Sequence, residues 1–354
     1  MALFQFRSTT EQVADYLRDE LTRRRWTGSM PGSGWLAKEL GVGKGTIEAA
    51  LALLENQGLL VPQGAGRPRR IELGSRQSGP ILKIQILLYE ESDRSSSITI
   101  KLVHQLQEAG HDADFSTKTL ADLKMDVNKV AKFANHADAD VWLVLSGSKD
   151  ILEWFASQPL PAYALFGRQP TVDIAGAGTL KSPALRQAVE RLVDLGHRRI
   201  VMLTREDRRK PVPGHMERRF LETLAEQGIS SGSYNLPDWE DNPEDFRRCL
   251  DSLFATTPPT CLIISEPQLY FAALQHLSLR GVVAPRDVSL ICCDWDPVFT
   301  WSEPKVAHLC WDSKLLIHKV VRWAGKIGRG KDDRRQSLIE AEFIEGSTVG
   351  PAPR

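Results

Sequence analysis

Residues 30–60, which read MPGSGWLAKELGVGKGTIEAALALLENQGLL, decide the architecture of the N-terminal part of the chain. Two apolar helical patterns, one with Leu36 and Leu40 and one that starts near Lys44, lie on either side of the turn at residues 41–43. In the second pattern the apolar side chains recur on one helical face, at Ile47, Ala50, Leu51 and Leu54. Two helices joined by such a short glycine-containing turn are typical of a helix-turn-helix motif.

The residues before this stretch predict a further helix. Ser8-Thr9-Thr10-Glu11 is a capping box, in which a hydroxyl and a carboxylate satisfy free amide groups at a helix start. Val13, Leu17 and Leu21 follow at four-residue spacing and give this helix one apolar face. We therefore expect a small helical domain over residues 1–73.

After the helix-turn-helix, the sequence predicts a β-hairpin with a basic tip. The chain has 45 basic and 45 acidic residues, so any nucleic-acid footprint must be local. Residues 1–73 hold ten Lys and Arg against eight Asp and Glu, a charge of only +2, so the placement of the charges matters more than their sum. Arg67, Arg69 and Arg70 crowd one hairpin, where they could contact phosphates or enter a minor groove. The alternative interpretation of this segment is a solvated surface loop.

The run from about residue 8 to 73 resembles the GntR-type winged helix-turn-helix of bacterial transcription regulators. In that family the pattern is Leu-Pro-Ser, Leu-Ala, Gly-Val-Ser-Arg, Thr-Val and then Leu-Glu-x-x-Gly-Leu-Leu, and residues 30–60 follow most of it. The departures cluster where the family touches DNA: Gly34 and Lys44 replace arginines, and Glu48 stands where some members have a base-reading Arg. The resemblance implies double-stranded operator DNA as a partner. Because of these departures, it does not predict which operator sequence this chain would bind.

The residue types at the second helix suggest how DNA would be contacted. Lys44 and Thr46 can reach phosphates from the helix start, and Gly45 permits a close backbone approach. Glu48 could accept a hydrogen bond from a cytosine amino group, or it could be an exposed helical charge without a role. The predicted DNA-binding residues are Lys44, Gly45, Thr46, Glu48, Arg67, Arg69 and Arg70.

A linker at residues 74–80 divides this domain from an α/β body at residues 81–354. The linker reads GSRQSGP and contains no apolar side chain except that of its closing proline. Beyond it, short apolar strand patterns alternate with amphipathic helical patterns in two successive series. Repeated βα units imply parallel, doubly wound sheets, and two series imply two lobes with a cleft between them.

The body resembles the effector domain of LacI/GalR-type repressors, which has the type I periplasmic-binding-protein fold. The matching residues include LGHRRI at 195–200, Arg280-Gly281, residues 287–290 (DVSL), Asp294 and Ser347-Thr348. A GntR-type reader joined to a LacI-type sensor is the architecture of arabinose-repressor-like regulators, which the whole chain resembles. The resemblance implies a small-molecule effector, above all a carbohydrate. We also expect homodimerisation through the body, because a single head with a charge of +2 would bind DNA weakly and regulators pair their heads on palindromes.

Ligands of open α/β sheets bind beyond the carboxyl ends of the strands, so the candidate ligand residues lie in the loops that follow them. Carboxylates, an arginine and nearby aromatic rings suit a ligand rich in hydroxyl groups. The resemblance adds that Asp294 matches a ligand-contacting Asp and that Trp239 matches a Trp that stacks on sugars. The predicted ligand-binding residues are Glu90, Ser146, Arg168, Trp239, Glu266, Asp294 and Trp295.

Two departures weaken the analogy with sugar sensors. The family carries an Arg at the position of Met216, and its Asn-Asp pair is Glu266-Pro267 here. These departures keep open a regulator whose sensor binds no ligand and serves only for dimerisation. Trp239 could instead fill a gap in the core, Asp294 could cap a turn, and polar loop ends such as Arg168 and Glu266 could simply be solvated.

The sequence contains no catalytic, cofactor or metal motif. It has no Walker loop, no HExxH and no GxSxG, so we expect a protein without enzymatic activity, cofactor or metal.

The five cysteines form an odd set without a CxxC pair, which indicates a reduced protein. No apolar run approaches the roughly 18 residues of a membrane span, and the N-terminus lacks the apolar core of a signal peptide. We therefore expect a cytoplasmic protein, which disfavours a further alternative, an exported small-molecule receptor.

Overall fold

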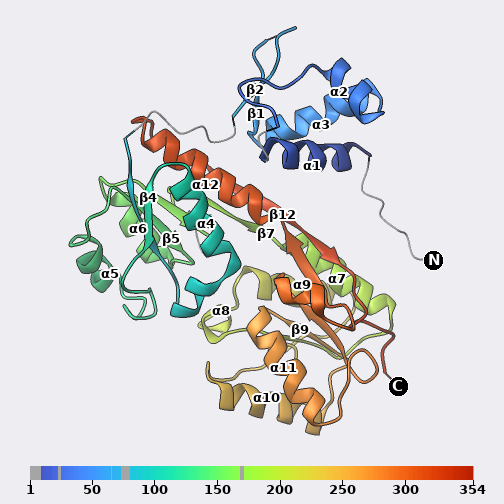
Figure 1. The fold of residues 1–354 in the computed structure, drawn as a ribbon. Coiled ribbons are helices and arrows are strands. Elements are labelled where there is room, and N and C mark those ends of the chain that lie inside the picture. Colours follow the sequence, from blue (N-terminus) through green and yellow to red (C-terminus); the bar gives the residue numbers. More distant parts are fainter. Residues whose placement is uncertain (1–8, 23–24, 65, 73–79, 168–170, 354) are drawn as a thin grey trace. The chain divides into compact units, whose positions relative to one another are not determined.

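The computed structural model describes residues 9–22, 25–64, 66–72, 80–167 and 171–353, which form two compact units. The first unit comprises residues 1–175 and 317–335, and the second comprises residues 176–316 and 336–354. The first unit contains a helical head, whose described residues lie between 9 and 72, and an α/β lobe (Figure 1). Ser8 of the predicted capping box and residues 74–79 of the predicted linker lie outside the described residues.

The head has three helices followed by a short antiparallel ribbon. Its elements are α1 (Thr9–Thr22), α2 (Ser33–Leu40), α3 (Lys44–Asn56), β1 (Leu60–Val61) and β2 (Arg70–Ile71). Leu60 pairs with Ile71 and Val61 with Arg70, as the hairpin prediction requires. The apolar faces predicted from the spacing meet in one core, in which Leu17, Leu36 and Leu51 are completely buried. Gly41 ends α2 in the left-handed region, at a φ of 66°, a conformation that glycine adopts without steric strain.

The α/β lobe of the first unit has a parallel sheet with strand order β4-β3-β5-β6. Tyr163 of β6 packs its ring against Trp323 of α12, whereas its neighbours Ala162 and Ala164 face Phe155 of α6, so helices cover both faces. The elements are β3 (Lys83–Leu87), η1 (Glu91–Ser95), α4 (Ser97–Glu108), β4 (Asp112–Phe115), α5 (Val127–Ala134), β5 (Val141–Leu145), α6 (Lys149–Ser157), β6 (Ala162–Leu165) and the part of α12 (Ser313–Ile327) that follows Leu316.

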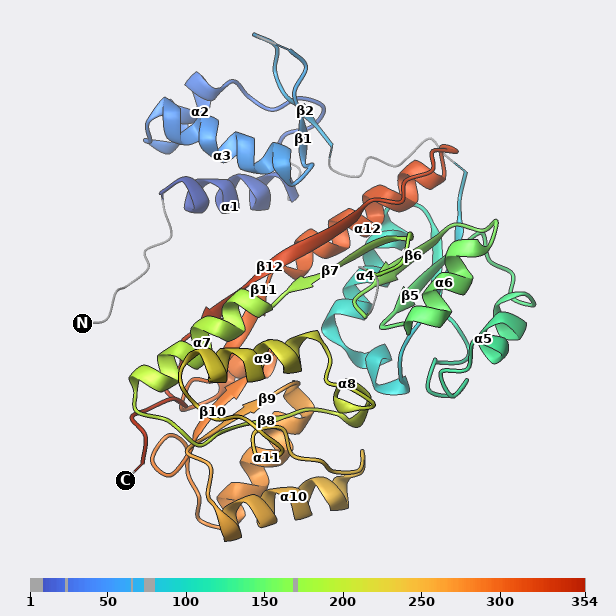
Figure 2. The same ribbon diagram turned by 180° about the vertical axis from the view of Figure 1, so that it is seen from behind.

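The second unit has strand order β7-β12-β11-β10-β9-β8 with helices on both faces (Figure 2). Ile200 and Met202 of β8 pack with α7 and α9, whereas Val201 and Leu203 face α10 and α11, because successive side chains of a strand point to opposite faces. The elements are β7 (Ala175–Leu180), α7 (Ser182–Asp194), β8 (Ile200–Leu203), α8 (Glu206–Arg209), α9 (His215–Glu226), α10 (Pro243–Thr256), β9 (Cys261–Ile264), α11 (Pro267–Leu279), β10 (Ser289–Cys292), η3 (Pro297–Trp301), β11 (Ala307–Trp311) and β12 (Gln336–Ile344).

The prediction of purely parallel sheets is wrong at one strand pair. β12 pairs antiparallel with β11 and parallel with β7. The chain between β11 and β12 passes through residues 317–335 of the first unit, so this connection is not a βαβ crossover that returns the chain to the same end of the sheet. The sequence analysis also missed β7 and β11. β7 reads AGAGTL, and alanine and glycine are poor strand formers.

Asp333, in the charged loop after α12, forms ion pairs that are expected to stabilise the first unit. The carboxylate of Asp333 accepts hydrogen bonds from Lys326 Nζ at 2.7 Å and from Arg335 Nε at 2.8 Å and Nη2 at 2.7 Å. Hydrogen bonds from Arg335 above all, with Lys326, hold the pKa of Asp333 well below its usual range. Asp333 is only 12% exposed, whereas its neighbour Asp332 is 80% exposed.

We expect Asp333→Asn to lower the free energy of unfolding by about 1–2 kcal/mol at pH 7 and Asp332→Asn to change it little. Because the folded pKa is depressed, this stabilisation is fully present above the unfolded pKa of about 4 and is lost progressively as the pH falls below that value toward the folded pKa. Urea unfolding of the parent and both variants between pH 7 and pH 3 tests this expectation. A difference between parent and Asp333→Asn that stays constant over this range would contradict the assignment.

Candidate DNA-contacting and ligand-binding residues

The start of α3 presents three of the predicted DNA-binding residues. Its N-cap is Gly43, which has no side chain to cap the helix, so the first amide groups receive no acceptor from the N-cap residue. Lys44 and Gly45 are exposed, and Thr46 is half-buried. A cationic side chain beside free helix N–H groups can bind a phosphate oxygen. The contacts of these residues with DNA stay predictions.

Arg69 does not lie free at the tip of the ribbon. Its Nη2 donates to Glu48 Oε2 at 2.8 Å, and its Nε donates to the carboxylate of Glu55. Both carboxylates belong to α3, so the structure places the cation on the helix and not beside the other two arginines. Sequence reasoning missed this arrangement, because Arg69 is 21 residues from Glu48 and 14 from Glu55.

The other two arginines of the hairpin are open to solvent. Arg67 is exposed, and its backbone N–H closes a turn on the carbonyl of Gly64 at 3.2 Å. Arg70 is also exposed and pairs with Glu72 at 3.3 Å, a surface ion pair of small energy. The side chains of Arg67 and Arg70 can therefore leave their present contacts and bind phosphate groups at a small cost in free energy.

The first unit contains two of the predicted ligand residues within the described part of the chain. Ser146 follows β5 in the left-handed region, at a φ of 54°, and its N–H donates to Leu165 O at 2.8 Å. Glu90 forms a capping box with Asp93 at the start of η1 and accepts from Ser92 Oγ at 2.7 Å. Its carboxylate therefore already has a structural function. Arg168 lies outside the described residues.

Asp294 is the centre of the candidate ligand site of the second unit. It follows β10, and its carboxylate accepts from Lys181 Nζ at 2.7 Å and from Trp311 Nε1 at 3.0 Å. It also accepts from the backbone N–H of Trp295 at 2.9 Å, while the Trp295 ring is exposed. Lys181 follows β7 and Trp311 ends β11, so the ends of three strands, β7, β10 and β11, contribute to one polar cluster.

Lys181 is the principal residue that sequence reasoning missed. It is separated from Asp294 by 113 residues, and β7, which positions it, was itself not predicted. Its side chain is only 17% exposed. The next residue, Ser182, has its Oγ 3.8 Å from the Sδ of Met216, the residue that stands where an arginine was expected.

Glu266 and Met216 lie at the starts of two helices of the same unit, α11 and α9. Glu266 accepts from Arg205 Nε at 2.9 Å, and Arg205 also pairs with Asp241 at 3.3 Å. His215 lies within 2.9 Å of Ser182 Oγ, beside Met216. The second unit thus offers both donors and acceptors at the carboxyl ends of its strands, the chemistry that hydroxyl groups require.

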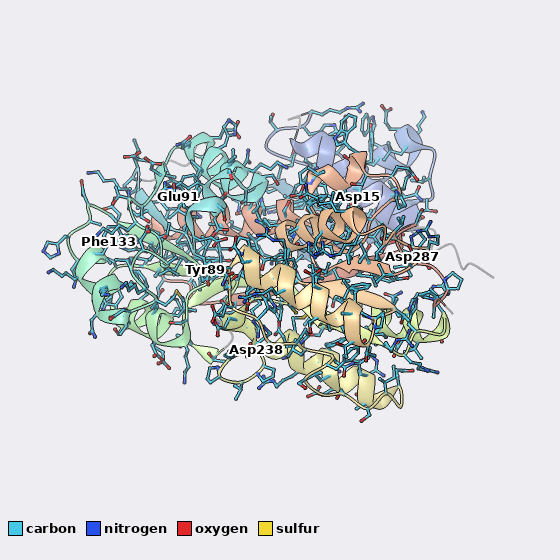
Figure 3. All side chains as sticks on the ribbon, turned by 90° about the horizontal axis from the view of Figure 1, so that it is seen from below. Asp15, Tyr89, Glu91, Phe133, Asp238 and Asp287 are labelled. Atoms are coloured by element: carbon cyan, nitrogen blue, oxygen red, sulfur yellow. The ribbon has the colours of Figure 1, made fainter. Side chains whose placement is uncertain are left out.

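Trp239, which the sequence analysis predicts to stack on a ligand, is buried in the core of the second unit. The side chain is 4% exposed and belongs to the core between the sheet and α10. Its ring packs on Phe246 at a centroid distance of 4.9 Å and lies under the guanidinium of Arg209 at 5.4 Å. Arg209 also donates to the carbonyl of Trp239 and to Asp238, which is labelled in Figure 3. The ring fills the core, as the alternative interpretation proposed.

Buried groups near the cluster do not provide a nucleophile. Burial raises the pKa of Cys293 to about 12 and raises the pKa of the neighbouring Cys292, so both remain thiols at neutral pH. Burial also raises the pKa of Glu217, whose carboxyl accepts from Thr204 Oγ1 at 3.2 Å. Among the described residues, no group of His, Cys, Asp and Glu is arranged to hold a metal ion. None of the helices in the described part is long and apolar enough to cross a membrane.

Comparison with known proteins identifies the fold of the body. Residues 189–349 match the model of a periplasmic binding protein-like domain family. A LacI family transcriptional regulator from Mycobacterium smegmatis is similar over 76% of this chain and 99% of its own, with a TM-score of 0.61 and 15% identity. A LacI family regulator from Enterococcus faecium with bound ribose covers 76% of this chain and 98% of its own, at a TM-score of 0.59 and 15% identity.

One further solved structure extends the similarity. The transcriptional regulator CelR in complex with cellobiose covers 90% of this chain and 100% of its own, with a TM-score of 0.63 and 17% identity. A sequence search of curated proteins gives no match. At these identities the structural similarity establishes the fold: the body is a periplasmic-binding-protein-like α/β domain as in LacI-family regulators.

Proposed function

We propose that this protein is a DNA-binding transcription regulator whose α/β body senses a small molecule. The observation that carries the proposal is the combination, in one chain, of a helix-turn-helix head with an exposed helix start and a body with the fold of LacI-family regulators. A small-molecule effector can regulate such a protein only through different affinities for its DNA-binding and non-binding states.

For the head we propose the GntR-type winged form. The antiparallel ribbon of β1 and β2 directly after α3 supports a wing, and Arg67 and Arg70 on it are exposed cations. The weak charge of the head favours binding as a homodimer, because two heads on a two-fold symmetric operator double the contacts. We propose repression as the regulatory effect.

For the effector we propose a carbohydrate or a similar polyhydroxylated molecule. The Lys181–Asp294 pair and the indole N–H of Trp311 support this, since a charged acceptor and donors side by side match neighbouring hydroxyl groups. The structures of CelR with cellobiose and of the Enterococcus faecium regulator with ribose point in the same direction.

A second candidate function is a regulator without effector binding, whose body serves only for dimerisation. The observation that favours it is that the carboxylate of Asp294 already accepts three hydrogen bonds within the protein, from Lys181, Trp311 and a backbone N–H. Thermal-shift measurements of the full chain against a panel of monosaccharides and disaccharides distinguish the two functions. A stabilising sugar supports the sensor, whereas the absence of any shift across the panel favours the dimerisation body.

The DNA-binding part of the proposal is tested with the salt dependence of binding. We expect Lys44→Ala and Arg67→Ala each to reduce the slope of log K against log salt concentration by about 0.9 for each bound head, because each removes one phosphate contact and its released counterion per head. Fluorescence anisotropy with a labelled duplex selected from a random library, at several salt concentrations, measures the slopes. Lys129→Ala, an exposed lysine of α5 in the α/β lobe, is a control with unchanged slope. If no duplex binds the parent protein, the proposed function fails.

A further inference from the structure

One arginine of the ribbon is fixed at both its side chain and its backbone. The guanidinium of Arg69 bridges Glu48 and Glu55 of α3, and the carbonyl of Arg69 accepts from the N–H of Met30 at 2.8 Å. Met30 precedes α2 and is buried in the core of the head. Arg69 therefore connects the ribbon with the segment before α2 and with the helix α3.

The spacing of the two carboxylates suits this bridge. Glu48 and Glu55 are seven residues apart, so they lie on the same face of α3 two turns from each other. The planar guanidinium presents N–H groups in diverging directions, which allows Nε to serve one carboxylate and Nη2 the other. A lysine ammonium at this position could act only as a single point charge.

Glu48 is also held from a second direction. Hydrogen bonds from Ser33, the first residue of α2, and from Arg69 lower the pKa of Glu48. The carboxylate therefore stays ionised between the start of α2 and the ribbon. The side chain that the sequence offered as a reader of cytosine is thus occupied with contacts inside the head.

We propose that Arg69 is a positioning residue that fixes the ribbon on α3, that Glu48 and Glu55 are its anchors, and that none of the three contacts DNA. This inference rests on the proposed function of the head in DNA binding. In this arrangement Arg67 and Arg70 make the phosphate contacts of the ribbon. Arg69 holds the ribbon in place, and this orients the other two arginines toward DNA.

The anchor function and a phosphate contact predict opposite effects for a neutral substitution of Glu55. Removal of a carboxylate near DNA ordinarily strengthens binding, because repulsion of the phosphates falls. Loss of an anchor releases the ribbon and weakens binding. Glu55→Gln therefore discriminates between the two functions of Arg69. Glu39→Gln is the matched control, since Glu39 is a carboxylate of α2 that pairs with Arg25 instead.

The first experiment needs no DNA. Hydrogen–deuterium exchange of the full chain is measured over residues 59–72 for the parent, Arg67→Ala, Arg69→Ala, Glu55→Gln and Glu39→Gln. We expect about threefold to tenfold faster exchange of the ribbon in Arg69→Ala and Glu55→Gln, and parent-like exchange in Arg67→Ala and Glu39→Gln. Parent-like exchange in both Arg69→Ala and Glu55→Gln would overturn the proposal. Arg69→Lys, which keeps the charge but loses the planar bridge, is expected to fall between parent and Arg69→Ala.

The second experiment measures affinity and salt slope on a mixed-sequence duplex of about 30 base pairs. We expect Glu55→Gln to weaken binding by about threefold to tenfold with an unchanged slope, because the released ribbon must be ordered again on DNA while Arg67 and Arg70 still contact phosphates in the complex. We expect Arg67→Ala to reduce the slope by about 0.9 for each bound head. Tighter binding by Glu55→Gln, or a slope reduction of the same size in Arg69→Ala as in Arg67→Ala, would overturn the proposal. If the parent does not bind DNA, the proposed function fails, while the exchange experiment still decides whether Arg69 fixes the ribbon.

Discussion

Asp294→Ala is expected to weaken effector binding by between about tenfold and more than a hundredfold. A hydrogen bond to a charged group contributes about 1.5–3 kcal/mol, which corresponds to this range of dissociation constants. The substitution also leaves Lys181 without its carboxylate partner at 2.7 Å, in a position where the side chain is mostly buried. The measurement is isothermal calorimetry of the full chain with the sugar that the thermal-shift panel identifies.

Two further variants show whether Asp294 acts on the ligand directly. Lys181→Met is expected to weaken binding by a similar factor, because the carboxylate then loses the cation that orients it. Asp194→Ala, an exposed carboxylate of α7, serves as the control and should bind like the parent. If Asp294→Ala lowers the melting temperature but binds the sugar with parental affinity, the carboxylate stabilises the strand ends and is not part of the ligand site.

Trp239→Ala is expected to lower the free energy of unfolding by about 3–5 kcal/mol, the usual cost of truncating a buried aromatic side chain to alanine. The ring packs on Phe246 and under Arg209, so the truncation removes contacts on two sides and leaves a cavity in the second unit. Trp301→Ala is the control, because the ring of Trp301 is 89% exposed and its removal should change the stability little. Urea unfolding followed by far-ultraviolet circular dichroism measures both effects.

A binding measurement separates this structural function from ligand stacking. We expect Trp239→Phe to retain the parental affinity for the identified sugar, because the smaller ring still fills most of the core site. A large loss of affinity in Trp239→Phe without a loss of stability would restore the stacking hypothesis.

Local sequence signals were sufficient for the head and for most of the body. In the head, the helical faces of Leu17, Leu36 and Leu51 were readable because residues three and four apart share a side of a helix, whatever packs against them. Buried strands such as Cys261–Ile264 were readable as apolar runs between amphipathic helices. β7 could not be predicted, because alanine and glycine have a low propensity for β-strands. β12 was readable as a strand, but its antiparallel partner was not, because pairing direction depends on the path of the connecting chain.

Local patterns of residues alone predicted the helix-turn-helix of the head, the alternation of strands and helices in the body, and Asp294 as a polar residue at a strand end. The contacts of the charged and aromatic side chains became known only from the folded chain. The fold placed Lys181 on Asp294, Arg69 on Glu48 and Glu55, and Trp239 in the core. A helix or strand pattern depends on neighbours within a few residues, whereas the ion pairs of Arg69 and Lys181 join residues from 14 to 113 positions apart. The packing of the Trp239 ring likewise depends on the helix and the arginine that the fold brings against it.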